Sequence, residues 1–168
     1  TVELRVPLTA GERLGYEAAW HEFFAAFDRF AALRPNAGFG EFVRWARADA
    51  AGRPGLLAWH RALRIASWTE AKANATAALL ERHRGARILV FTPDCETAYA
   101  LARQHLIAPV TAELPRGERD RALAGFGKGK LRVLAGPRLL ETGILEGTAD
   151  VGIVIGASIG HAQRGARV

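Results

Sequence analysis

Apolar side chains recur at helical spacing through the first half of the chain. Between residues 10 and 33 the aromatic and aliphatic positions fall every three or four residues, which predicts a long amphipathic helix. Thr9 directly precedes this stretch, and Glu12 lies three positions after Thr9. This pair is typical of a capping box at the start of a helix. The predicted elements of this half are a short strand over 2–8 and helices over 10–33, 40–50 and 56–83, the last with a kink near Ser67.

After Gly85 the pattern changes to short apolar runs separated by more polar stretches. An uninterrupted run such as RILVFT at 87–92 is typical of a buried strand in a parallel sheet. Asp94 is a predicted N-cap for the helix after it. Alternation of strands and helices with short links predicts a parallel sheet covered by helices, and therefore an α/β fold. The predicted elements are strands over 87–92, 107–110, 131–136 and 150–156, helices over 95–105, 116–126 and from Gly160, and a helix or turn over 138–144.

The composition, with 49% hydrophobic and 24% charged residues among 168, is typical of a globular protein with a packed core. No apolar run reaches the roughly 18 residues of a membrane span, so we expect no membrane partner. Cys95 is the single cysteine, which excludes an internal disulfide and a cysteine-rich zinc site and favours the reducing cytoplasm. The five histidines lack ligand spacing, so no metal site is expected. The absence of methionine and the start at Thr1 suggest a piece of a longer protein.

The net charge of +6 narrows the class of partner. Of the 23 basic residues, 20 are arginine. Arginine binds phosphate through two parallel hydrogen bonds and stacks on bases, so this composition suits a nucleic acid or nucleotide. A GC-rich genome also replaces lysine with arginine. It explains the share of arginine equally well, but it does not explain the net positive charge.

Common phosphate-binding and nucleophile motifs are missing from the sequence. The Gly-Lys pairs at 127–128 and 129–130 lack both the earlier glycine and the following serine or threonine of a Walker A loop. No Asp-Glu pair closes an apolar strand as in Walker B, and no Gly-x-Ser-x-Gly elbow occurs. The chain therefore carries no Walker-type phosphate loop.

Three segments in a fixed order carry the clearest functional signal. They are RILVFT at 87–92, LLETGILEGTADV at 139–151 and QRGAR at 163–167. In this order and spacing they resemble motifs IV, V and VI of the second RecA-like lobe of superfamily 2 helicases. Within that superfamily the chain most resembles the XPB-type DNA repair and transcription helicases, over its whole length. Its further landmarks are VPL at 6–8, RIA at 64–66 followed by Lys72, and LERH at 80–83.

The resemblance implies a domain organisation. Residues 1–9 would be the strand or linker that leaves a first lobe. Residues 10–66 would form a helical thumb-like insertion. Residues 67–168 would form the second RecA-like lobe, an α/β domain whose parallel sheet has flanking helices but no phosphate loop of its own.

The resemblance also implies the motor lobe of an ATP-dependent DNA helicase or translocase, a hydrolase acting on ATP. Arg167 is then the expected arginine finger, with Arg164 and Gln163 beside it, because a guanidinium neutralises charge spreading over the γ-phosphoryl oxygens. Gly143 and Glu141 are expected at the nucleotide interface. ATP and Mg²⁺ would be bound mainly by the first lobe, so the chain alone is expected to be inactive. The alternative for QRGAR is the solvated start of a helix.

DNA contacts are expected mostly at phosphates, because a translocase must ignore base sequence. Thr92, at the end of a strand, is the candidate for a backbone phosphate. Two basic sets are further candidates, with ordinary surface charge as the alternative: Arg116, Arg119, Lys128 and Lys130, and, in the helical part, Arg44, Arg47 and Arg53 beside Trp45. Phe23, Phe24 and Phe27 are expected in the helical core. The implied partners are DNA, the first RecA-like lobe, and a repair nuclease or transcription protein.

The sequence departs from the XPB-type pattern at several motif positions. Leu145 stands where the family has aspartate, and Gly147 where it has proline. Ala135 and Gly136 end the strand at which serine or threonine is expected, and Ala166 replaces the glycine of motif VI. The alternative function is therefore a degenerate, non-catalytic lobe kept for binding DNA or protein.

Overall fold

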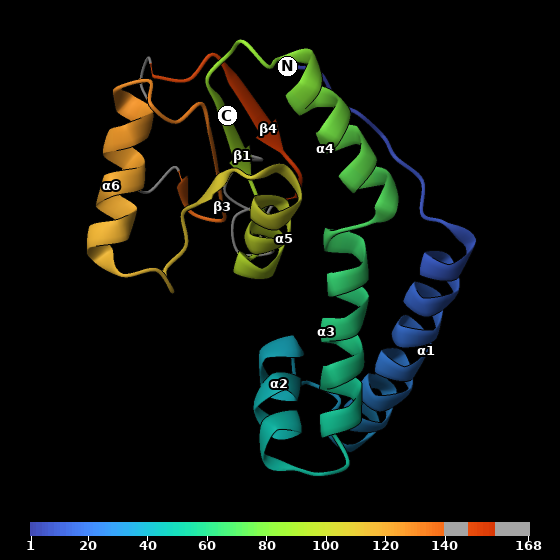
Figure 1. Ribbon diagram of the computed structural model, residues 1–168. Helices are drawn as coiled ribbons and strands as arrows, with labels where there is room; N and C mark the ends of the chain where they lie inside the picture. The colour runs from blue at the N-terminus through green and yellow to red at the C-terminus, as the bar shows by residue number, and fades with distance from the viewer. Residues whose placement is uncertain (140–147, 157–168) are drawn as a thin grey trace. The chain divides into compact units, whose positions relative to one another are not determined.

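Two units make up the chain in the computed structural model, which describes residues 1–139 and 148–156 (Figure 1). Residues Thr1–Ala71 form the first unit and Lys72–Val168 the second. The helix expected from Gly160 and most of the element expected over 138–144 lie outside the described residues.

Three helices build the first unit: α1 (Ala10–Leu33), α2 (Phe39–Ala48) and α3 (Arg53–Ser67). The capping box predicted for α1 is confirmed, since Glu12 N donates to Thr9 Oγ1 over 3.3 Å and Thr9 N donates to Glu12 Oε2 over 2.8 Å. Both α1 and α2 pack against α3. Small residues bring α1 and α3 together, because a Cβ on Gly55 would lie 2.3 Å from Ala26 Cβ.

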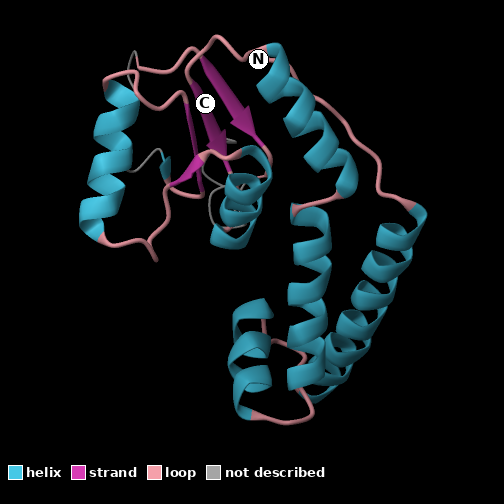
Figure 2. Ribbon diagram, in the orientation of Figure 1, coloured by secondary structure: helices cyan, strands magenta, loops and turns pink. Residues whose placement is uncertain are grey.

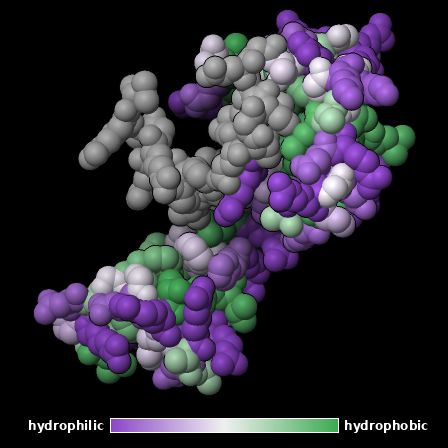
Figure 3. All heavy atoms as spheres, turned by 90° about the vertical axis from the view of Figure 1, so that its left-hand side faces the viewer, coloured by the Kyte–Doolittle hydropathy of each residue, from purple (hydrophilic) through white to green (hydrophobic). Residues whose placement is uncertain are grey.

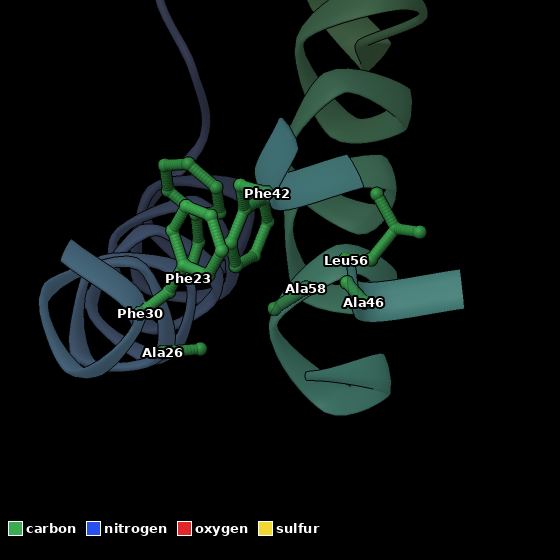
Figure 4. Close-up of a cluster of buried hydrophobic side chains, with 7 residues drawn as sticks. All are labelled: Phe23, Ala26, Phe30, Phe42, Ala46, Leu56 and Ala58. Carbon is green, nitrogen blue, oxygen red and sulfur yellow. The ribbon is translucent and has the colours of Figure 1, made fainter. Parts of the chain in front are cut away.

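Phe42 is fully buried in the core of the first unit (Figure 4). Its ring contacts the rings of Phe23, Phe27, Phe30, Phe39 and Trp45. The predicted core role is confirmed for Phe23, which is buried, and for Phe27, which packs against the core. It is wrong for Phe24, whose side chain is 52% exposed because one helical step turns it about 100° away from Phe23.

Two predictions for this half are wrong. Residues 2–8 form no strand, because a strand needs a hydrogen-bonded partner and no described strand pairs with this segment. The helix expected over 56–83 is two helices, α3 and α4 (Glu70–Arg82), with Trp68 extended between them. Ser67 Oγ donates to Leu63 O over 2.7 Å, a local bond of the kind that bends helices. The kink expected near Ser67 is therefore a complete break.

The second unit contains a four-stranded parallel sheet in the order β2-β3-β1-β4 (Figure 2). Its strands are β1 (Ile88–Phe91), β2 (Ala108–Pro109), β3 (Val133–Gly136) and β4 (Val151–Val154), and its connecting helices are α5 (Cys95–His105) and α6 (Arg116–Gly127). The connections through α5 and α6 run in opposite directions across the sheet. Right-handed crossovers then place these two helices on opposite faces. The predicted α/β fold with a parallel sheet and flanking helices is confirmed.

The apolar run of β1 lies at the centre of this sheet. Ile88, Leu89 and Val90 are almost fully buried, as an uninterrupted apolar strand covered on both faces should be. Leu89 and Leu134 pack with Phe126 of α6 on one face. This packing fixes the ends of β1 and β3, and with them the loops in which the candidate site lies.

Candidate functional site

The carboxyl ends of the parallel strands form one edge of the sheet. β1 ends before Thr92, β3 ends at Gly136, and β4 leads into Gly156. Open α/β sheets bind ligands outside this edge, where the loops after the strands meet. The candidate site therefore consists of the residues that follow the strands and of those that begin α5 and α6.

Thr92 lies inside this edge rather than on its surface. Its side chain is 2% exposed, and its hydroxyl donates to the carbonyl oxygen of Asp94 over 2.8 Å. Its amide donates to the carbonyl oxygen of Gly136 over 3.2 Å, which ties β1 to the end of β3. The hydroxyl thus holds the loop before α5. A contact between this group and a phosphate needs that hydrogen bond to be exchanged.

Asp94 caps α5 as the sequence predicts, because its Oδ1 accepts from Thr97 N over 2.7 Å. Cys95 follows at the start of the helix and is partly exposed. Burial raises the pKa of the Cys95 thiol above its ordinary value, and the carboxylates of Glu113 and Asp94 act in the same direction. A thiol with a raised pKa stays protonated at neutral pH, which is a poor state for a nucleophile.

Gly136 has no room for a side chain. A Cβ at this position would lie 2.1 Å from the carbonyl oxygen of Val110. The neighbouring amide of Val110 donates to Ala135 O over 2.8 Å, so the two backbones are held together. This close approach leaves glycine as the residue that fits at the end of β3.

Lys72 is a cation at this edge that the sequence singled out only as a landmark. Its Nζ lies 3.9 Å from the position that a Cβ on Gly156 would occupy, beside Pro93. Burial lowers the pKa of Lys72 below its ordinary value. One feature of the sequence marks it, since Lys72 is the only lysine before residue 128 in a chain that otherwise uses arginine.

The four basic residues in and after α6 do not form a single cluster. Arg116 and Arg119 lie in the first turn of α6, beside the carboxyl edge of the sheet, whereas Lys128 and Lys130 follow the end of the helix. Twelve helical residues span about 18 Å, so the two pairs lie at opposite edges. Arg116 Nε lies 3.8 Å from Asp120 Oδ2, and both side chains are largely exposed. Figure 3 views the second unit from the side of α6, where its described part exposes hydrophilic residues together with hydrophobic ones.

The helical unit presents Arg44 and Arg47 on the exposed side of α2. Arg44 pairs with Glu41 over 3.8 Å at the surface. Trp45 is only partly exposed, because its ring packs against the rings of Phe30 and Phe42. The expected combination of these basic residues with Trp45 for gripping a DNA strand stays a prediction, since Trp45 is neither buried nor fully exposed.

The predicted nucleotide-interface residues Glu141 and Gly143 lie outside the described residues, as do Gln163, Arg164 and Arg167 of QRGAR. Their roles stay predictions. Within the part of the chain that the structure describes, no group of three or more His, Cys, Asp or Glu side chains is placed to hold a metal ion. No helix among residues 1–139 and 148–156 has the length and apolar character needed to cross a membrane.

Comparison with known proteins connects this architecture to a family. Residues 71–165 match the family described as helicase conserved C-terminal domain. Over 118 residues the chain is 32% identical to the DNA 3'-5' translocase XPB2 of Sulfurisphaera tokodaii. This alignment covers 70% of the chain, which spans only 27% of the length of that relative.

The fold has a similar solved counterpart. The Sulfolobus solfataricus SWI2/SNF2 ATPase C-terminal domain matches with a TM-score of 0.63 and 15% sequence identity, over 88% of this chain and 68% of that one. The family match covers more than half of the chain and includes all four described strands. The chain therefore belongs to the helicase conserved C-terminal domain family of superfamily 2.

Proposed function

We propose that this chain is the second motor lobe of an ATP-dependent DNA helicase or translocase of the XPB type. The observation that carries the proposal is the 32% identity to a DNA 3'-5' translocase over 70% of the chain. The loops after the parallel strands gather at one edge of the sheet. Such an edge is the kind of surface with which a second lobe can close over a nucleotide that the first lobe binds.

In this proposal, ATP and Mg²⁺ are bound mainly by a first RecA-like lobe. Arg167 neutralises the charge that develops on the γ-phosphoryl group, and Arg164 and Gln163 orient it. Glu141 and Gly143 contribute to the same interface, where a glycine permits close approach of the backbone. Cations at the carboxyl edge, including Lys72 and Arg116, make this edge suitable for a polyanion.

DNA is bound through its phosphates in this proposal. Arg116 and Arg119 lie at the carboxyl edge, and Arg44 and Arg47 provide exposed charge in the helical unit. Lys128 and Lys130 lie at the other edge of the sheet, so they would meet DNA only along a separate path. Thr92 contributes through its hydroxyl if the bond to Asp94 is exchanged for one to phosphate.

The test is DNA-stimulated ATP hydrolysis by the protein that carries this chain together with a first RecA-like lobe. The Arg167→Ala variant should lose roughly three or more orders of magnitude in rate while keeping its DNA affinity. Arg103→Ala, an exposed change on α5, is the matched control and should keep the wild-type rate. Unchanged hydrolysis in Arg167→Ala would overturn the finger assignment. DNA binding without hydrolysis in the wild type would favour the degenerate binding lobe instead.

A further inference from the structure

A pocket of about 380 Å³ lies at the amino edge of the sheet, opposite the edge where the motifs gather. It is lined by the residues that lead into β1, β2 and β3 and by the ends of α4 and α5. A four-residue strand is about 13 Å long, so the pocket is one strand length away from the carboxyl edge. A ligand here would leave the proposed nucleotide interface open.

The walls of this pocket combine apolar and polar surface, and its charges are mostly positive. Leu80, Ile88, Ile107 and Leu131 are among the apolar lining residues. The charged lining residues are Arg84, Lys130 and Arg132 against one carboxylate, that of Glu81.

Two of these three cations already have partners. Arg84 Nη1 lies 3.4 Å from Glu81 Oε1, and the Arg132 guanidinium donates to the carbonyl oxygen of Arg84. Lys130 is exposed and has no ion pair within the described residues. His105 also lines the pocket, and its Nε2 is buried without a hydrogen-bond partner among them. The pocket therefore offers an unpaired cation and an unsatisfied imidazole nitrogen beside apolar surface.

Leu106 adds an apolar projection at the side of this pocket. It ends α5 in the left-handed conformation, with φ of 53°, and is 93% exposed. Glycine or asparagine is the usual residue here, because a Cβ in this conformation is strained. A leucine that is both strained and exposed has no role in the packing of the described chain. Its position beside the pocket is consistent with contact to another molecule.

The geometry points to this pocket as a docking site for a short acidic–apolar peptide segment of a partner protein. An apolar side chain of the segment would enter between the ends of α4 and α5 and pack against Leu106. A neighbouring carboxylate would pair with Lys130. The apolar residues in the lining favour a peptide over DNA, because a DNA backbone presents phosphates and sugars and would leave these residues without apolar partners.

The test uses a library of short peptides that combine aspartate or glutamate with leucine, isoleucine or phenylalanine, and a matched library with amides in place of the carboxylates. Both are selected on the immobilised chain, and the best acidic binder is measured by fluorescence anisotropy. Lys130→Glu should weaken its binding by about tenfold or more. Arg103→Glu reverses the charge of an exposed arginine on α5 that is outside the pocket lining, and it should leave the affinity unchanged.

The Leu106→Gly variant distinguishes a loss of peptide binding from a loss of protein stability. Glycine relieves the left-handed strain, so this variant should melt at a higher temperature than the wild type and yet bind the peptide more weakly. Equal selection from both libraries, or unchanged affinity in Lys130→Glu, would overturn the proposal. A loss of affinity for duplex DNA, with no effect on peptide binding, would reassign this edge to DNA.

Discussion

Gly136 and Val110 approach so closely that a Cβ on the glycine would lie 2.1 Å from the valine carbonyl oxygen. The contact joins the end of β3 to the residue after β2, next to Thr92. It sets the spacing of the loops at the carboxyl edge. It also limits which motif residues this strand end can carry.

Gly136→Ala should therefore destabilise the second unit. Backbone atoms must move to admit the methyl group, and overpacking of this kind costs about 1–3 kcal/mol. Gly117→Ala is the control, because a Cβ there meets nothing within 4 Å and alanine suits a helix better than glycine. Urea unfolding curves of both variants check the difference. A Gly136→Ala protein as stable as Gly117→Ala would show that the two backbones separate at little cost.

Glu12 caps two helices with one carboxylate. It accepts from Thr9 N and, through Oε1, from Glu70 N at the start of α4 over 2.8 Å. These backbone hydrogen bonds lower the pKa of Glu12 below its ordinary value of 4.5, and the bond from Thr9 has the largest effect. Because the folded-state pKa is the lower one, the stabilisation is complete above the ordinary value and is lost as the pH falls through the lowered one.

The melting temperature of the wild type should therefore fall further between about pH 6 and pH 3 than that of a Glu12→Gln variant, which has no carboxylate to protonate at this position. Glu17→Gln, on the exposed side of the same helix, should follow the wild-type pH dependence. Melting curves across this range check both variants. If the melting temperature of Glu12→Gln falls as far as that of the wild type, the Glu12 carboxylate does not contribute to acid unfolding.

Leu56 and Leu57 form a matched pair on α3. Leu56 is 8% exposed within the aromatic core, whereas Leu57 is 62% exposed. Leu56→Ala should cost about 2–5 kcal/mol of unfolding free energy, through the transfer energy of the removed atoms and the cavity left behind. Leu57→Ala should stay within about 0.5 kcal/mol of the wild type. Equal destabilisation in the two variants, measured by denaturant unfolding, would contradict the packing of α3 described above.

Arg116 and Arg119 should contribute to DNA affinity through phosphates alone. Changing both to glutamine should weaken binding to all DNA sequences by similar factors. The slope of the logarithm of the binding constant against the logarithm of the salt concentration should fall in magnitude by about one for each phosphate that is no longer neutralised. Arg103→Gln, an exposed change on α5, is the control and should keep the slope. Titrations of labelled DNA at several salt concentrations measure the slopes. A salt dependence that is flat in the wild type would contradict DNA binding through phosphates.

The local elements follow from the sequence alone. Helical spacing, the Thr9–Glu12 pattern and Asp94 placed α1, α2, α5 and α6 within a few residues, since their hydrogen bonds join neighbours in the chain. The apolar runs identified four strands and the parallel class, and ordered motifs indicated the helicase family.

Features that depend on distant partners were decided by the tertiary structure. The strand order brought Gly136 against Val110, and the start of α4 gave Glu12 its second hydrogen bond. Residues 2–8 are apolar enough for a strand, but the described chain offers no strand to pair with them. Packing against Phe30 and Phe42 left Trp45 only partly exposed, and α6 carried its two basic pairs to opposite edges. Spacing along a chain specifies which residues share a helix face, whereas long-range packing decides what that face meets.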